Sequence, residues 1–227
     1  MRIALSMAIG VGMLLTLAGQ ADETTADEKK AVSAAQLLKG KPGIDTTLHP
    51  NARVAVRFDT ATDATLVALA KYPQIGAIQA LDGTACTTRG FTALQSLPNL
   101  RRLTLNKSRV TDKDLALIAG CKNLQLLVLP ESAITDNGLA AVTKLTRLEH
   151  LDLSDNPRLT DKAIDHIKTL ERLEVLLLNK TGITDTGLFE LAPLEGLRTL
   201  NVAATKVTAE AAEKFPTQMP NLRVVRR

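Results

Sequence analysis

A histidine and an aspartate stand two residues apart in the stretch EHLDLS, at His150 and Asp152. Side chains two apart on a strand point to the same face, so we expect both on one surface. Acid-base or nucleophilic catalysis also needs a nucleophile or a metal within reach. Ser154 is expected on the same strand but pointing alongside, and His49 and His166 are isolated. We therefore expect no catalytic residues and no enzyme activity.

The two cysteines offer thiol chemistry, but their positions favour burial. Cys121 stands where other copies of a recurring pattern carry residues such as Leu145, and Cys86 takes the position of Ile134. Both are predicted to be small buried hydrophobic side chains, at different heights of the core. The alternatives are a disulfide or a reactive thiol, and export of the chain would permit the disulfide.

A column of aspartates recurs along the chain, each directly after a threonine. The pairs are Thr111-Asp112, Thr135-Asp136, Thr160-Asp161 and Thr184-Asp185, with Thr208 at the fifth position. We interpret them as helix starts, in which threonine caps the helix and aspartate places negative charge at its positive end. Neighbouring carboxylates would lie about 10 Å apart, too far to share a calcium ion with ligands at about 2.4 Å. We expect no metal and no cofactor.

The elements that carry these residues recur with a period of 24 or 25 residues. Each copy begins at one of the following leucines: Leu100, Leu124, Leu148, Leu173, Leu197 and Leu222. Apolar residues three and five positions later predict a short strand with one buried face, as at Leu103 and Leu105. A one-sided helix follows, with buried positions such as Leu115 and Ile118. Two weaker copies precede these, giving seven repeats and a terminal half-repeat.

This pattern resembles the leucine-rich repeat proteins, in the secreted bacterial, Cys-containing or Thr-Asp-Gly-Leu variety. The resemblance covers residues 51–227. It implies an α/β fold: a right-handed solenoid of about seven 24–25-residue repeats, with parallel strands on the concave face and helices on the convex face. Such families are interaction scaffolds, as the ribonuclease inhibitor illustrates.

The residues before the repeats divide into two parts. Residues 1–21 combine Arg2, an uncharged stretch from Ile3 to Ala18 and small residues before position 22, which predicts a cleaved secretory signal peptide. The alternative is an uncleaved anchor, but 16 residues diluted by Ser, Gly and Thr fall short of the roughly 20 that span a bilayer. We expect no stable membrane span after cleavage, and a secreted, periplasmic or cell-envelope location.

Residues 22–50 are predicted to hold a disordered segment and an N-terminal cap. The polar run Asp22–Lys30 is expected to be disordered. Helical spacing over Ala31–Lys39, followed by a short strand from Ile44 to Leu48, predicts a cap for the open end of the repeat array.

Composition narrows the class of partner. Five aromatic residues among 227 provide almost no stacking surface for bases or sugars. The net charge of +4, from 28 basic and 24 acidic residues, is too small and too interleaved for a polyanion partner. We expect a protein or peptide ligand and no nucleic acid.

Residues between the buried strand positions should face the concave side in columns. The first column runs Arg53, Ala77, Arg102, Leu126, His150, Val175, Thr199, Val224, and the second runs Ala55, Gln79, Thr104, Val128, Asp152, Leu177, Asn201, Arg226. The third runs Arg57, Leu81, Asn106, Pro130, Ser154, Asn179, Ala203. The predicted protein-binding residues are Arg102, Leu126, Val128, His150, Asp152, Val175, Leu177 and Asn201.

Four of these residues are aliphatic without a folding reason, which is typical of an interaction patch. The alternative is that they only raise strand propensity. Arg53, Arg57 and Arg102 suggest a separate contact with an acidic partner. The sequence thus predicts an exported, non-enzymatic binding scaffold; a structural or envelope-associated spacer is the alternative.

Overall fold

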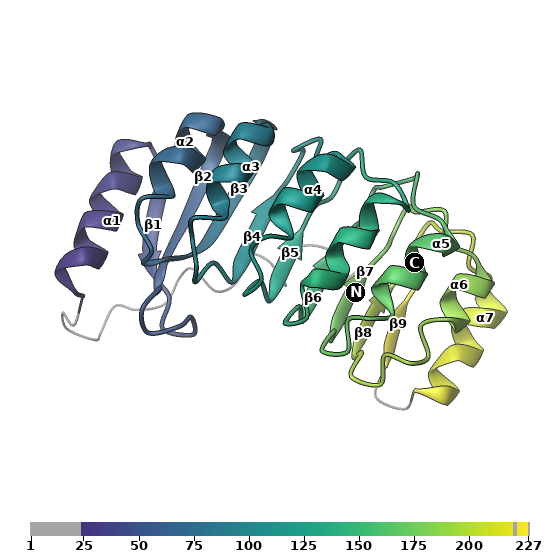
Figure 1. Cartoon of the computed structure of the whole chain (residues 1–227). Coiled ribbons are helices and arrows are strands. Elements are labelled where there is room, and N and C mark those ends of the chain that lie inside the picture. The colour runs from purple at the N-terminus through teal and green to yellow at the C-terminus, as the bar shows by residue number, and fades with distance from the viewer. Residues whose placement is uncertain (1–23, 220–221, 227) are drawn as a thin grey trace, which may run out of the picture.

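The computed structural model of the chain describes residues 24–219 and 222–226. Within them one nine-stranded sheet follows the order of the chain, with helices along one side (Figure 1). The strands are β1 (Lys41–Ile44), β2 (Val54–Thr62), β3 (Ile75–Ala85), β4 (Arg102–Leu105), β5 (Leu126–Val128), β6 (His150–Asp152), β7 (Val175–Leu177), β8 (Thr199–Asn201) and β9 (Arg223–Val225). The helices are α1 (Ala26–Leu37), α2 (Asp63–Leu69), α3 (Thr88–Leu94), α4 (Asp112–Ile118), the 3-10 helix η1 (Gly138–Lys144), α5 (Asp161–Ile167), α6 (Asp185–Phe189), α7 (Ala209–Lys214) and the 3-10 helix η2 (Phe215–Gln218).

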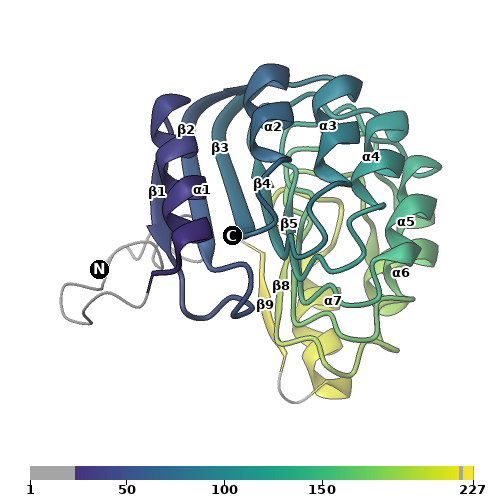
Figure 2. The same cartoon turned by 60° about the vertical axis from the view of Figure 1, so that its left-hand side comes forward.

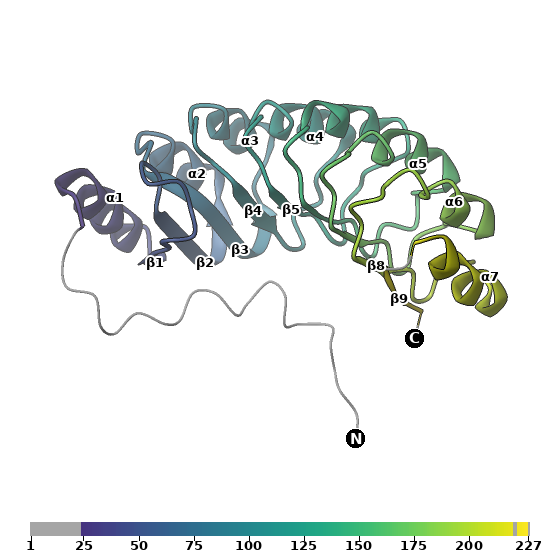
Figure 3. The ribbon, with the colours of Figure 1, turned by 90° about the horizontal axis from the view of Figure 1, so that it is seen from below.

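The sheet bends into an open arc, with the strands on its inner side and the helices on its outer side (Figure 3). Strand β1 pairs antiparallel with β2, and every later neighbour in the described sheet is parallel. Each strand from β2 to β8 leads to a helix, and β9 closes the series. The predicted leucine-rich repeat solenoid, with seven repeats and a half-repeat, is confirmed.

The core is the ladder of repeat leucines. Strand β4 alternates half-buried and buried residues, so Leu103 and Leu105 point inward and are fully buried. Leu100, which opens the same repeat, is also fully buried, and so are the helix residues Leu115 and Ile118. Because one repeat cannot enclose these side chains, stacking of neighbours provides the cover and holds the arc together.

The aspartate column joins adjacent repeats. Each carboxylate accepts the backbone N–H and the hydroxyl of the threonine one repeat later, at 2.7–2.8 Å and 2.5–2.9 Å respectively. The pairs are Asp63 with Thr87, Asp112 with Thr135, Asp136 with Thr160, Asp161 with Thr184, and Asp185 with Thr208. The capping prediction therefore covers only part of their role. The hydroxyls of Thr111, Thr184 and Thr208 cap their helices, but Thr160 makes no side-chain cap and η1 begins after Asn137.

One junction uses a different acceptor. Thr88 stands where the repeats of the five pairs above carry aspartate, so the preceding repeat provides no carboxylate at this position for Thr111. Asp114 replaces it from within α4: its Oδ2 accepts the Thr111 hydroxyl at 2.6 Å, and its Oδ1 accepts the Thr88 hydroxyl at 2.7 Å. The junction keeps its hydrogen bonds with the carboxylate supplied by the later repeat.

The predicted columns are out of register at both ends of the sheet. Ala55 pairs with Ala77 and Arg57 with Gln79, two residues away from the predicted match. The mismatch arises because β2 buries Val54, Val56 and Phe58 in alternation, and the pair that lies beside Ile78 and Ala80 is Val56 and Phe58. A separate one-residue bulge lies at Gly76, where a Cβ would lie 2.0 Å from the Ala52 carbonyl oxygen. At the other end Thr199 pairs with Arg223, and Val224 packs on the core instead of facing the concave side.

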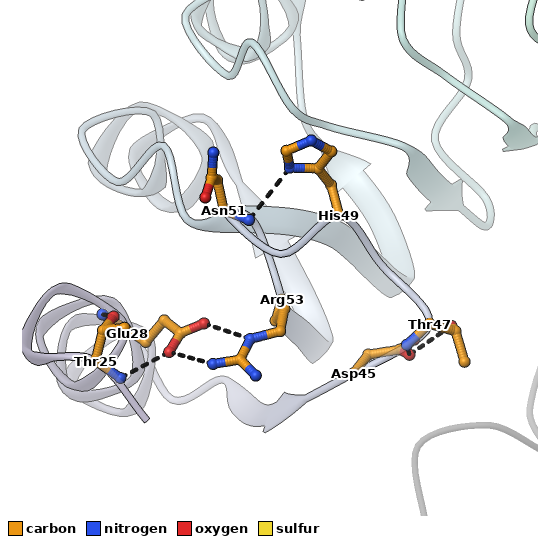
Figure 4. Close-up of polar contacts among 7 residues, drawn as sticks. All are labelled: Thr25, Glu28, Asp45, Thr47, His49, Asn51 and Arg53. Carbon is orange, nitrogen blue, oxygen red and sulfur yellow. Dashed lines mark hydrogen bonds and ion pairs between the residues drawn. The ribbon is translucent and has the colours of Figure 1, made fainter. Parts of the chain in front are cut away.

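The expectation of disorder over Asp22–Lys30 is wrong for the described residues from Ala26 onward, which begin α1. Thr25 and Glu28 form a capping box, in which each side chain accepts the other residue's backbone N–H. Glu28 also pairs with Arg53 at 2.9 Å and is 2% exposed (Figure 4). The helix covers the N-terminal end of the array beside β1 (Figure 2). The predicted cap strand is present, but as β1, three residues earlier than expected.

The predicted signal peptide, residues 1–21, lies outside the described residues. Among the residues that are described, no helix has the length and apolar character needed to cross a membrane.

Candidate functional site

The eight predicted binding residues lie together on the inner face of the arc. Strand pairing places Arg102, Leu126, His150 and Val175 side by side in one row. A second row contains Val128, Asp152, Leu177 and Asn201. All eight side chains are half-buried, and they alternate along each strand with fully buried leucines.

Four neighbouring aliphatic side chains, Leu126, Val128, Val175 and Leu177, form what we call the aliphatic patch. Leu126 and Val175 flank His150 in the first row, and Val128 and Leu177 flank Asp152 in the second. The patch therefore surrounds one imidazole and one carboxylate on three adjacent strands.

His150 and Asp152 share a face, as predicted, but they do not form an acid-base pair with a nucleophile. Burial lowers the pKa of His150 below its ordinary value of 6.5, and the charge of Asp152 opposes that shift. Asp152 Oδ1 accepts the backbone N–H of Ser154 at 2.9 Å and also its hydroxyl. In the described structure no hydrogen bond joins His150 to Ser154. The serine is 6% exposed, so it is placed as a structural residue.

Arg102 lies at the predicted position, but its charge is already paired. Its two terminal nitrogens donate to Asp45 Oδ2 at 2.7 Å and to Thr47 Oγ1 at 2.9 Å. Asp45 and Thr47 belong to the loop between β1 and β2, which therefore reaches β4 (Figure 4 shows the loop residues). The repeat pattern does not indicate this contact, because the two partners are 57 and 55 residues from Arg102.

The same loop changes the character of the N-terminal end of the concave face. Leu48 and Ala52 are buried, and Gly76 in β3 admits their close approach. Arg53 is engaged by Glu28, so two of the three arginines expected to attract an acidic partner are paired internally. Arg57 keeps a buried Nε with no hydrogen-bond partner among the described residues. The loop therefore lies at the N-terminal end of the concave face and pairs the charge of Arg102 on β4.

The His, Cys, Asp and Glu side chains of the described residues were the candidates for metal and thiol chemistry. No group of three or more His, Cys, Asp or Glu residues is placed to hold a metal ion there. Cys86 and Cys121 are both free and 5% exposed, as predicted for core residues. Burial raises the pKa of each thiol to about 12, with nearby aspartates adding to the effect at Cys86. Such thiols are protonated and unreactive at neutral pH.

Comparison with known proteins agrees with this architecture. Residues 98–157 match the family model described as leucine rich repeat. An internalin from Listeria monocytogenes is similar in structure, with a TM-score of 0.56 and 20% identity over 71% of this chain. Internalin C2 from the same organism has a TM-score of 0.57 and 22% identity, also over 71% of this chain. Residues 98–157 thus match leucine-rich repeats, and the described array has the solenoid fold of these structures.

The leucine-rich repeat array matches only part of each internalin, 43% of the first structure and 66% of internalin C2. At sequence identities of 20% and 22%, the similarity to these two structures is a similarity of fold. No curated protein matches the sequence.

Proposed function

We propose that the protein is an exported, non-enzymatic scaffold that binds a protein or peptide partner on the concave face across β5–β8. The observation that carries the proposal is the aliphatic patch. Its four side chains lie on the open face of a sheet whose core is already complete without them. Patches of this kind, with polar groups at their centre and rim, are typical of interaction surfaces.

Two further features support the proposal. Leucine-rich repeat families are interaction scaffolds, and their curved sheets provide extended concave binding surfaces. The N-terminal loop pairs the charge of Arg102 and packs against Gly76, so the arginine is not free for a partner, whereas the aliphatic patch on β5 and β7 has no such cover from the loop. The export part of the proposal rests on the sequence of residues 1–21.

A rigid spacer in the cell envelope is the alternative. It is favoured by the half-burial of the patch, because aliphatic residues in a shaded strand position also raise strand propensity. A spacer would show no saturable binding to any soluble peptide or protein.

A peptide-display experiment separates the two. A random 12-residue phage library is selected on the immobilised protein, and enriched peptides are synthesised for titration. The double variant Leu126→Lys/Leu177→Lys should weaken binding by at least tenfold, since two charges would occupy the patch. The matched control Ser96→Lys/Ala140→Lys adds the same charge at exposed positions outside the patch and should bind like the wild type.

Circular dichroism of both double variants checks that the fold is intact. Equal affinities for the two double variants would refute the concave site, and a lack of saturable binding to the wild type would favour the spacer.

A further inference from the structure

The second row of the concave face carries a carboxylate whose charge is not compensated. Asp152 Oδ1 is used by Ser154, while Asp152 makes no ion pair and Oδ2 accepts no hydrogen bond among the described residues. The side chains beside it in the row are Val128 and Leu177, which supply no polar group. His150 does not neutralise it, because burial lowers the pKa of the imidazole and keeps it uncharged at pH 7.

The same local arrangement occurs elsewhere in the chain with a cation bound to it. Asp45 Oδ1 accepts the backbone N–H of Thr47 at 2.9 Å and its hydroxyl at 2.6 Å, as Asp152 Oδ1 does with Ser154. At Asp45 the free oxygen, Oδ2, takes the guanidinium of Arg102 at 2.7 Å. The described residues thus contain one Asp-x-Ser/Thr turn that binds an arginine, at Asp45, and two without one, at Asp82 outside the patch and at Asp152 in the middle of the concave face.

We propose that the concave face binds a peptide segment that carries an arginine, with the guanidinium on Asp152 Oδ2 and aliphatic neighbours on the aliphatic patch. This inference rests on the proposed function and specifies the chemistry of the partner. Asn179 Oδ1, which lies 2.7 Å from Ser154 Oγ, adds a second oxygen at the polar end of the site.

Arginine fits this position better than lysine for two reasons. The guanidinium is more weakly hydrated than an ammonium group, so it loses less on entering a half-buried site between Val128 and Leu177. Its methylene stem can also pack along these aliphatic side chains while the charged end reaches the carboxylate. A partner with an acidic side chain at this point would instead meet the uncompensated negative charge of Asp152.

The peptides enriched on the wild-type protein provide the test. We expect them to share an arginine flanked by aliphatic residues, and their dissociation constant to rise about tenfold or more with Asp152→Asn. Replacing the peptide arginine by lysine should weaken binding several-fold. Asp82→Asn is the matched control, because Asp82 makes the same turn with Thr84 and lies outside the proposed site. This variant should bind within twofold of the wild type.

Each result separates this inference from the proposed function. Peptides that lose affinity for Leu126→Lys/Leu177→Lys but bind Asp152→Asn normally, or that lack arginine, would overturn the arginine site and leave the concave site standing. Peptides indifferent to both variants would overturn both. Recovery of no arginine-containing peptide would also overturn the inference.

Discussion

Replacement of Asp112 by alanine should destabilise the protein although the residue lies far from the concave face. Its two oxygens accept the backbone N–H of Thr135 at 2.8 Å and the Thr135 hydroxyl at 2.7 Å. Hydrogen bonds to a charged group contribute about 1.5–3 kcal/mol each, and water can partly replace them at this half-buried site. We expect Asp112→Ala to lower the free energy of unfolding by about 2–3 kcal/mol.

The same carboxylate explains why glycine occupies position 138. A Cβ on Gly138 would lie 2.0 Å from Asp112 Oδ1 and 2.3 Å from its Cγ. Gly138→Ala alone should therefore cost about 1–3 kcal/mol, the usual penalty for overpacking. In the Asp112→Ala background the clash is gone, and the helix propensity of alanine, better than that of glycine by about 1 kcal/mol, should offset any remaining cost of Gly138→Ala. Alanine stands at the equivalent positions 163 and 211, where Asp136 and Asp185 hold Thr160 and Thr208. The backbone of this turn therefore admits a side chain, and the clash belongs to the placement of the Asp112 carboxylate against position 138.

A double-mutant cycle measured by urea unfolding with far-ultraviolet circular dichroism tests this reasoning. The two substitutions together should cost no more than Asp112→Ala alone, which corresponds to an interaction energy of about 2 kcal/mol. Gly196→Ala serves as control, because its Cβ would meet only ordinary contacts at 3.6 Å and beyond. If Gly138→Ala costs the same free energy in both backgrounds, the carboxylate is not what excludes a side chain at position 138.

Four further predictions concern individual side chains. Arg53→Ala should cost about 3 kcal/mol in chemical denaturation, because it leaves Glu28 buried without its charged partner, whereas Lys41→Ala, which breaks an exposed pair with Asp59, should leave the unfolding midpoint almost unchanged. Burial acts to raise the pKa of Glu28, but hydrogen bonds from Arg53 and Thr25 outweigh it and hold the pKa below 4.5. The stability that this lowered pKa provides should persist above pH 4.5 and fall as the medium is acidified further. A variant with glutamine at that position should lose this pH dependence. The His150 imidazole should titrate below pH 6.5 by NMR, and lower still in Asp152→Asn, because the carboxylate charge raises its pKa; an unchanged midpoint would contradict the coupling. Thiol titration should find two sulfhydryls after denaturation and almost none in the native protein, and a count of zero after denaturation would indicate a disulfide.

The repeat leucines explain why so much of the fold could be predicted. A period of 24 or 25 residues with apolar positions such as Leu127 and Leu151 places every strand beside the equivalent strand of its neighbour. All eight candidate binding residues therefore fell on one face in the correct order. The Asp112–Thr135 bond was missed, although its separation of 23 residues, close to one repeat, is the signal that would have identified it.

The ends of the array were predicted less well because they follow no repeat. Strand β2 has three alternating buried residues, Val54, Val56 and Phe58, and the prediction matched the first two instead of the last two to Ile78 and Ala80, which shifted the first columns by two positions. The acidic and basic run before Ala31 suggested disorder by composition, whereas Thr25 and Glu28 three residues apart carry a capping-box signature. The pairing of Arg102 with Asp45 depends on the path of a loop, which local sequence does not determine.

The junction at Asp114, where the later repeat provides the carboxylate, determines which whole repeats can be removed from the array. Excising residues 135–159 would bring Thr160 against Asp112, so an acceptor would still meet the incoming threonine. Excising residues 111–134 would instead set Thr135 beside Thr88 and remove Asp114, leaving that threonine's amide with no acceptor. Gain or loss of whole repeats, in evolution or by engineering, should therefore be tolerated where the preceding repeat provides the aspartate, and not at the junction that depends on Asp114.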